Sequence, residues 1–366
     1  MASFLLAMND NFADRLIAWQ RQYGRHDLPW QGGDAYAVWL SEIMLQQTQV
    51  ATVIPYFQRF IASFPTIASL VAASEEQVLV HWSGLGYYAR GRNLHRAARL
   101  IVEKYGGEFP QQFTQMLELP GIGRSTAAAI CALAFHQRYA ILDGNVKRLL
   151  ARHAAINCWT GDKKVEAQLW QLAEQRLPVD DKIKSGSGIA IYTQALMDMG
   201  ATICTRSQPK CGVCPVANSC QALATQRVQQ LPTPRPRKII PERSAVLLLL
   251  KVGDEILLEK RPATGIWGGL WSLPQFDDEL SARAACATLL AADQNQTATA
   301  AIEALPPFVH VFTHFKLQIN PWLIQLKRQP LLVAESGTIW LAMDDALNAA
   351  IPKPVRTLLE NLLRKN

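Results

Sequence analysis

The sequence has no long hydrophobic run and no sign of export from the cell. Apolar runs such as residues 245–250 are far too short to cross a membrane. The apolar start, residues 1–8, lacks a basic segment and a cleavage site, so we expect no signal peptide. Beyond one clustered run, the cysteines are scattered (Cys131, Cys158, Cys286), as is usual in a reducing compartment. We therefore expect a cytoplasmic protein without membrane segments.

Strand-like alternation is nearly absent from residues 1–223. Apolar residues there recur at helical spacing, as Val50, Ile54 and Phe57 do. The sequence therefore predicts an all-α domain over this range.

A proline-rich, basic stretch at residues 224–243 ends the helical pattern, because its prolines cannot continue a helix. Two β-rich runs follow at residues 245–251 and 255–260, and a further strand is predicted near residues 309–319. We predict a linker at 224–243 and an α+β domain at 244–366.

Negative charge is in the minority. Lys and Arg number 37 against 30 Asp and Glu, which gives a formal net charge of +7. An excess of this size is a weak signal, but it favours a polyanionic partner such as nucleic acid.

Four cysteines, Cys204, Cys211, Cys214 and Cys220, form the run C-x6-C-x2-C-x5-C. Structural zinc sites usually join two short C-x2-C pairs through a longer loop. One short pair flanked by longer spacers is closer to an iron–sulfur pattern. Spacing therefore favours iron–sulfur over zinc, and either metal over disulfides. Such a cluster can be a purely structural clip.

Residues 119–126, Leu-Pro-Gly-Ile-Gly-Arg-Ser-Thr, lie between two helical segments and contain Gly121 and Gly123. A helix–hairpin–helix uses such glycines to bring backbone N–H groups close to a phosphate. The alternative is an ordinary helical hairpin. Arg124 and the basic composition favour binding of a DNA backbone.

Two carboxylates have both a chemical and a structural interpretation. Glu42 lies among apolar residues, and poor solvation would raise its pKa and suit a general acid. It could equally occupy the exposed side of an amphipathic helix. Asp143 comes just before a helix, where Asp is a common N-cap. From these residues alone, the structural interpretations are preferred.

Taken in order, these segments resemble the adenine DNA glycosylases of the MutY type, in the helix–hairpin–helix superfamily that includes endonuclease III. The resemblance covers the N-terminal domain and is carried by residues 28–30, 39–49, 84–90, 119–125, 141–148, 197–201 and the four cysteines.

The resemblance implies that Glu42 protonates N7 of a flipped-out adenine and then helps water to attack the sugar, while Asp143 stabilises the oxocarbenium-like sugar. Burial should raise the pKa of Glu42, and Asp143 should stay charged beside helix N–H groups. The four cysteines would bind a [4Fe–4S] cluster.

The resemblance also implies a set of DNA contacts. Leu28 and Trp30 would line the adenine pocket, and the residues that fill or wedge the gap would be Gln47, Thr48, Leu85 and Tyr87. Ser125 stands where endonuclease III-like enzymes carry a lysine nucleophile, so we expect a monofunctional glycosylase. Lys147 could trap an aldehyde as a side reaction.

The second domain resembles the MutT-like, Nudix-fold domain that recognises 8-oxoguanine in these proteins. Phe312, Thr313 and His314 match the family's Phe-Ser-His element, and Thr313 keeps the hydroxyl. No R-E-x-x-E-E cluster follows the glycine-rich turn at 265–269, so magnesium-dependent pyrophosphatase chemistry is not expected.

The sequence thus predicts a two-domain base-excision repair enzyme, acting as a monomer on double-stranded DNA with adenine opposite 8-oxoguanine or guanine. The alternatives are an endonuclease III-like lyase, a non-catalytic binder of DNA lesions and, more remotely, a nucleotide pyrophosphatase.

Overall fold

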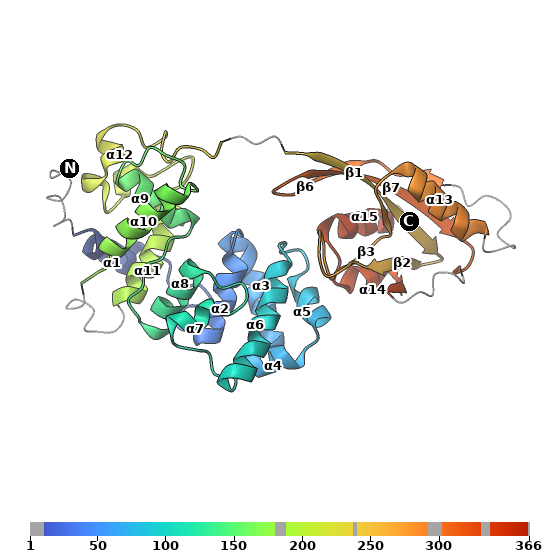
Figure 1. Ribbon diagram of the computed structural model, residues 1–366, viewed down its shortest axis with the longest axis horizontal. Coiled ribbons are helices and arrows are strands. Elements are labelled where there is room, and N and C mark those ends of the chain that lie inside the picture. The colour runs from blue at the N-terminus through green and yellow to red at the C-terminus, as the bar shows by residue number, and fades with distance from the viewer. Residues whose placement is uncertain (1–10, 180–187, 237–239, 292–301, 331–336, 365–366) are drawn as a thin grey trace. The chain divides into compact units, whose positions relative to one another are not determined.

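The computed structural model describes residues 11–179, 188–236, 240–291, 302–330 and 337–364 (Figure 1). The apolar start at residues 1–8 lies outside the described residues. By packing, the chain divides into two compact units, residues 1–71 with 96–237 and residues 72–95 with 238–366. Within the described ranges, every helix is too short or too polar to cross a lipid bilayer.

Helices form the regular structure described up to residue 236, which confirms the predicted all-α region. Their bounds are α1 (Phe12–Tyr23), α2 (Ala35–Leu45), α3 (Val50–Ser63), α4 (Ile67–Ala72), α5 (Glu75–Trp82), α6 (Ala89–Tyr105), α7 (Phe113–Leu117), α8 (Arg124–Phe135), α9 (Gly144–His153), α10 (Lys163–Gln175), α11 (Gly188–Asp198) and α12 (Gln221–Ala224).

Small side chains let α8 lie at the centre of the first unit. The alanine-rich stretch of this helix, residues 127–132, is fully buried and packs against α2 and α11. Asp34 is the N-cap of α2, and its side chain accepts a hydrogen bond from the Ala37 N–H at 2.9 Å. These contacts fix the direction of α2, the helix that carries Glu42.

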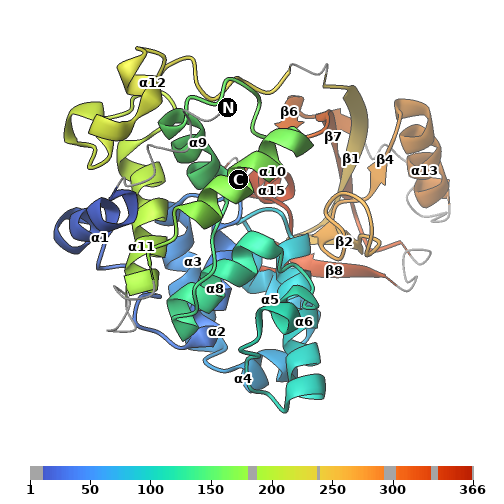
Figure 2. The same cartoon turned by 60° about the vertical axis from the view of Figure 1, so that its left-hand side comes forward.

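A short π-helix, Met199–Ile203, continues α11 and packs against α9. Gly200 faces Asn145 so closely that a Cβ at this position would lie 2.4 Å from the Asn145 Cβ. On its other side α9 contacts α12, and the two helices lie side by side in both views (Figures 1 and 2). Glycine at position 200 therefore sets how near α9 approaches the π-helix.

The C-terminal part of the chain forms a mixed sheet. Its central strands β1 (Glu242–Val252) and β7 (Lys316–Leu326) are parallel, with Glu242 opposite Lys316 and Val252 opposite Leu326. The remaining strands pair antiparallel with these or with one another: β2 (Glu255–Lys260), β3 (Trp271–Ser272), β4 (Gln275–Phe276), β5 (Ile302–Ala304), β6 (Phe308–Val311) and β8 (Thr338–Ala342).

Helices cover both faces of this sheet (Figure 1). Leu247 and Leu249 of β1 join the apolar cluster that includes α14 (Met343–Asn348) and α15 (Lys353–Leu363). Leu248 and Leu250 join the cluster on the opposite face, which includes α13 (Glu279–Ala291). The unbroken apolar run of β1 thus reflects burial on both faces, and the predicted combination of strands and helices is confirmed.

One strand prediction was wrong in detail. The single strand expected near residues 309–319 is two antiparallel strands, β6 and β7. The turn between them is closed by a hydrogen bond from the Phe312 N–H to the Phe315 carbonyl oxygen at 2.9 Å. Phe312, Thr313 and His314 therefore project from a turn and not from the middle of a strand.

Substitution of Gly200 by Ala tests the contact between the π-helix and α9. We expect the free energy of unfolding of the helical unit to fall by about 1–3 kcal/mol, because the added methyl overpacks the contact with Asn145. Denaturant unfolding followed by helical circular dichroism measures the change. Gly212→Ala is the matched control, since a Cβ there meets no atom within 4 Å. Equal stability of the two variants would contradict the described packing.

Candidate active site

A cavity of about 920 Å³ lies in the first unit between α2, α8, α9, α11 and the π-helix. The structure brings together there seven of the residues predicted for the site: Leu28, Trp30, Glu42, Gln47, Thr48, Ser125 and Asp143. They come from four separate segments of the chain, residues 28–30, 39–49, 119–125 and 141–148, so the cavity is a product of tertiary packing.

Glu42 reaches the cavity from the middle of α2. Its neighbours Ser41 and Ile43 are buried, and Glu42 itself is half-buried at the cavity wall. Burial, followed by the negative charge of Asp143, raises the pKa of its carboxyl to about 8. The exposed alternative for Glu42 is therefore wrong, and this carboxyl is mostly protonated at neutral pH.

Asp143 caps α9 and also lines the cavity. Its Oδ1 accepts a hydrogen bond from the Val146 N–H at 2.8 Å. Burial raises the pKa of this carboxyl, while hydrogen bonds from the Val146 and Asn145 N–H groups and the positive charge of Arg148 act in the opposite direction. On balance the pKa is raised, so the expectation that Asp143 stays charged is not supported. The cap nevertheless orients the carboxyl at the cavity wall, and its role at the sugar stays a prediction.

The helix–hairpin–helix is joined to this site by Ser125. The Ser125 Oγ accepts a hydrogen bond from the N–H of Leu142, the residue just before Asp143, at 2.9 Å. The hairpin itself turns at Gly121, whose φ of +83° favours glycine, and Gly123 caps α8. Ser125 therefore fixes the backbone that presents Asp143.

A linked group of polar residues at the site, Arg25, Gln194 and Asp198, was not predicted from the sequence. Asp198 is fully buried and accepts hydrogen bonds from the Arg25 backbone N–H at 2.9 Å and from Arg25 Nε at 2.8 Å. Gln194 Nε2 donates to the same carboxylate at 2.9 Å. Arg25 and Gln194 line the cavity. The sequence signal that could have found them was the pair of polar residues Gln194 and Asp198, four positions apart in the mostly apolar α11.

Other predicted contacts lie away from this cavity. Lys147 Nζ pairs with Glu166 Oε1 at 2.6 Å. Leu85 and Tyr87 occupy the loop between α5 and α6, in the second packing unit; Leu85 is buried, and Tyr87 is exposed with a φ of +49°. Their roles at the DNA, like those of Phe312, Thr313 and His314, stay predictions.

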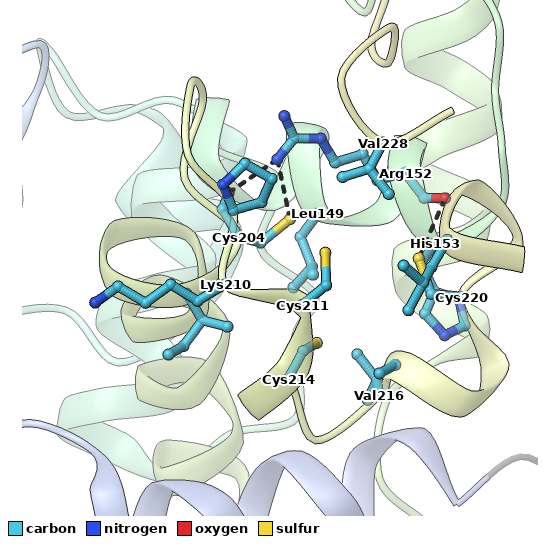
Figure 3. Close-up of a pocket in the computed structure, with 14 residues that line it drawn as sticks. Leu149, Arg152, His153, Cys204, Lys210, Cys211, Cys214, Val216, Cys220 and Val228 are labelled. Carbon is cyan, nitrogen blue, oxygen red and sulfur yellow. Dashed lines mark hydrogen bonds between the residues drawn. The ribbon is translucent and has the colours of Figure 1, made fainter. Parts of the chain in front are cut away.

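The four clustered cysteines line one small cavity beside the end of α9 (Figure 3). Apolar side chains, among them Leu149 and Val216, complete its wall. Burial and the neighbouring cysteines raise the pKa of the Cys214 thiol to about 11, so binding iron must displace protons from the thiols. Within the described residues no tight group of three ligands for a single ion forms, and the sulfurs instead surround a common space. An all-thiol donor set arranged in this way fits an iron–sulfur cluster.

Comparison with known proteins agrees with both the helix–hairpin–helix site and the iron–sulfur loop. Residues 40–175 match the family described as HhH-GPD superfamily base excision DNA repair protein. Residues 204–220 match the iron–sulfur binding domain of endonuclease III, and residues 245–361 match the NUDIX domain. The adenine DNA glycosylase of Buchnera aphidicola subsp. Acyrthosiphon pisum is 38% identical over 97% of this chain and 98% of its own length. The chain belongs to the adenine DNA glycosylase family.

The human adenine DNA glycosylase is 35% identical over 93% of this chain and 72% of its own length. A thermostable thymine-DNA glycosylase of known structure superposes with a TM-score of 0.52 at 25% identity, covering 60% of this chain and 98% of that one. An endonuclease III trapped on DNA gives 0.50 at 19% identity, covering 60% of this chain and 97% of that one, which supports the fold. The predicted base-excision repair glycosylase, its DNA binding and its [4Fe–4S] cluster are confirmed.

The raised pKa of Glu42 can be measured by carboxyl NMR titration of labelled protein. We expect a value near 8, and Asp143→Asn should lower it because one nearby negative charge is removed. Asp162→Asn is the matched control, since Asp162 caps the neighbouring helix α10 through the Lys164 and Val165 N–H groups. A Glu42 pKa in the ordinary carboxyl range would show that the cavity does not desolvate this group.

Proposed function

We propose that this adenine DNA glycosylase removes adenine paired with 8-oxoguanine or guanine in double-stranded DNA and leaves an abasic site, acting as a monomer. The observation that carries the proposal is the pair of unequal carboxyls, Glu42 and Asp143, on the wall of one cavity. Burial raises the pKa of Glu42 to about 8, whereas at Asp143 helix N–H groups and nearby positive charge counteract the rise in pKa that burial causes.

These two environments suit the two halves of glycosidic hydrolysis. Glu42 holds a proton at neutral pH and delivers it to N7 of adenine, which makes the base a better leaving group. Asp143, oriented by the Val146 N–H, offers negative charge to the oxocarbenium-like sugar. Deprotonated Glu42 then accepts a proton from the water that attacks the sugar.

The base must leave the helix to reach these groups. Leu28 and Trp30 supply apolar walls for it, and the Trp30 ring is itself held edge-on against Phe57 at 5.4 Å between ring centroids. Arg25 and Gln194, anchored by Asp198, give the cavity a polar side. A flat heterocycle with polar edges fits such a lining.

A glycosylase that also cuts the strand needs an amine nucleophile at the sugar. Position 125 carries a serine whose Oγ is engaged with the Leu142 N–H. The nearby Lys147 Nζ is paired with Glu166. The arrangement therefore supports hydrolysis without strand cleavage.

Scission of a duplex with adenine opposite 8-oxoguanine tests the chemistry. Under single-turnover conditions we expect breaks only after hot alkali, and Glu42→Gln should reduce the rate at least about 100-fold, because the general acid is lost. Glu103→Gln, the same change at an exposed position of α6, should leave the rate unchanged.

Two other results would redirect the assignment. Breaks without alkali would indicate a lyase. Absence of breaks in every sample, with lesion binding retained, would indicate a non-catalytic lesion binder.

The rate of adenine excision opposite 8-oxoguanine, relative to the rate opposite guanine, tests the proposed role of the second domain. Thr313→Ala should slow excision opposite 8-oxoguanine by roughly fivefold relative to excision opposite guanine, because one hydrogen bond is lost. Thr288→Ala on α13 removes an exposed hydroxyl elsewhere in the domain and serves as control. A Thr313→Ala enzyme with the wild-type ratio of rates would refute the role of Thr313.

A further inference from the structure

The last turn of α9 buries a charged side chain against the iron–sulfur loop. Arg152 is 2% exposed and lines the cavity formed by the four thiols. A guanidinium stays charged at any physiological pH, so burying it is costly unless each donor finds an acceptor. Its acceptors therefore indicate what the side chain does.

Those acceptors belong to the cluster-binding segment and to the chain that follows it, and Figure 3 shows the guanidinium beside Cys204. Arg152 Nη1 donates to the Thr205 carbonyl oxygen at 2.6 Å and lies 3.4 Å from Cys204 Sγ. Its Nη2 donates to the Arg206 carbonyl oxygen at 2.9 Å, and its Nε donates to that of Leu231 at 2.8 Å.

The same turn also reaches the other end of the cysteine run. The Arg152 carbonyl oxygen lies 3.8 Å from Cys220 Sγ, and His153 Nε2 is 2.9 Å from Ser219 Oγ. Arg152 thus contacts both the first and the last of the four cysteines. Leu231 lies in the predicted linker and is 1% exposed. Because the guanidinium donates to its carbonyl oxygen, Arg152 also holds this part of the linker in place.

We propose that Arg152 is a positioning residue for the iron–sulfur cluster, which holds the loop at Cys204 and sets the reduction potential of the cluster through its charge and its donation to the Cys204 sulfur. Arg148 differs from it, because Arg148 Nε donates to the carbonyl oxygen of Cys204 at 2.9 Å and its Nη2 to that of Gly200.

The physical basis is the charge of the bound cluster. Donors to cysteine sulfur and nearby positive charge stabilise the more negative, reduced state and so raise the reduction potential. The backbone contacts act separately, because they hold the loop against opening and slow the loss of iron. Arg152 therefore affects two quantities that a purely structural residue would not change together.

Two substitutions separate these effects. Arg152→Gln removes the charge and most of the donors, whereas Arg152→Lys keeps the charge but cannot reach all four acceptors at once. Arg138→Gln is the control, since Arg138 Nε also donates to a backbone carbonyl oxygen, that of Pro178 at 2.9 Å, away from the thiols. The full-length protein is used throughout.

Iron and sulfide per chain, cluster absorbance during challenge with a chelator, and the reduction potential are measured. For Arg152→Gln we expect at least roughly tenfold faster loss of iron and a more negative potential. Arg152→Lys should lose iron faster than wild type at a potential near the wild-type value. Arg138→Gln should match wild type in both.

Wild-type iron retention in Arg152→Gln would overturn the holding role, and an unchanged potential would overturn the electrostatic one. Circular dichroism of the helices confirms that each variant is folded. If Arg152→Gln does not fold, Arg152→Lys decides the holding role, and wild-type iron retention in that variant would overturn it.

Discussion

Helix α9 is the constraint on which both functional features of the first unit depend. Asp143 caps its first turn at the wall of the cavity, and Arg152 lies in its last turn against the cysteines. An α-helix of fixed length is a rigid rod, so its two ends keep a constant separation and orientation. The contact of Gly200 with Asn145 sets how closely α9 packs against the π-helix. A displacement of α9 would therefore alter the candidate active site and the cluster loop together.

The site contains three carboxyls whose burial as charged groups would cost free energy of folding. Each of them meets this cost in a different way. Glu42 avoids the cost of a buried charge by holding a proton, as its raised pKa shows. At Asp143 the N–H groups of the first turn of α9 counteract part of the rise in pKa that burial causes. Asp198 is neutralised directly by Arg25. Three carboxyls within one site thus have three environments, which is the kind of difference that the proposed division into an acid and an ionised partner requires.

Neighbouring residues in the sequence, taken alone, favoured a structural interpretation of Glu42 and Asp143 over a catalytic one. An Asp before a helix is usually a cap, and a Glu on a helix is usually exposed. The first statement is true here, and it is compatible with catalysis. The second fails because α2 and α8 bring Glu42 to a cavity wall. Arg25 escaped prediction for a related reason, since its partner Asp198 lies far from it in the sequence.

The sequence by itself determined the division into helical and sheet-containing parts, the iron–sulfur loop and the hairpin glycines. Those features depend on neighbours within a few residues, through periodicity, ligand spacing and backbone freedom. The pKa of Glu42, the paired Arg25 and Asp198, and the contacts of Arg152 were decided by tertiary structure alone. Each depends on desolvation or on a partner from a distant segment, and neither quantity exists until the chain has packed.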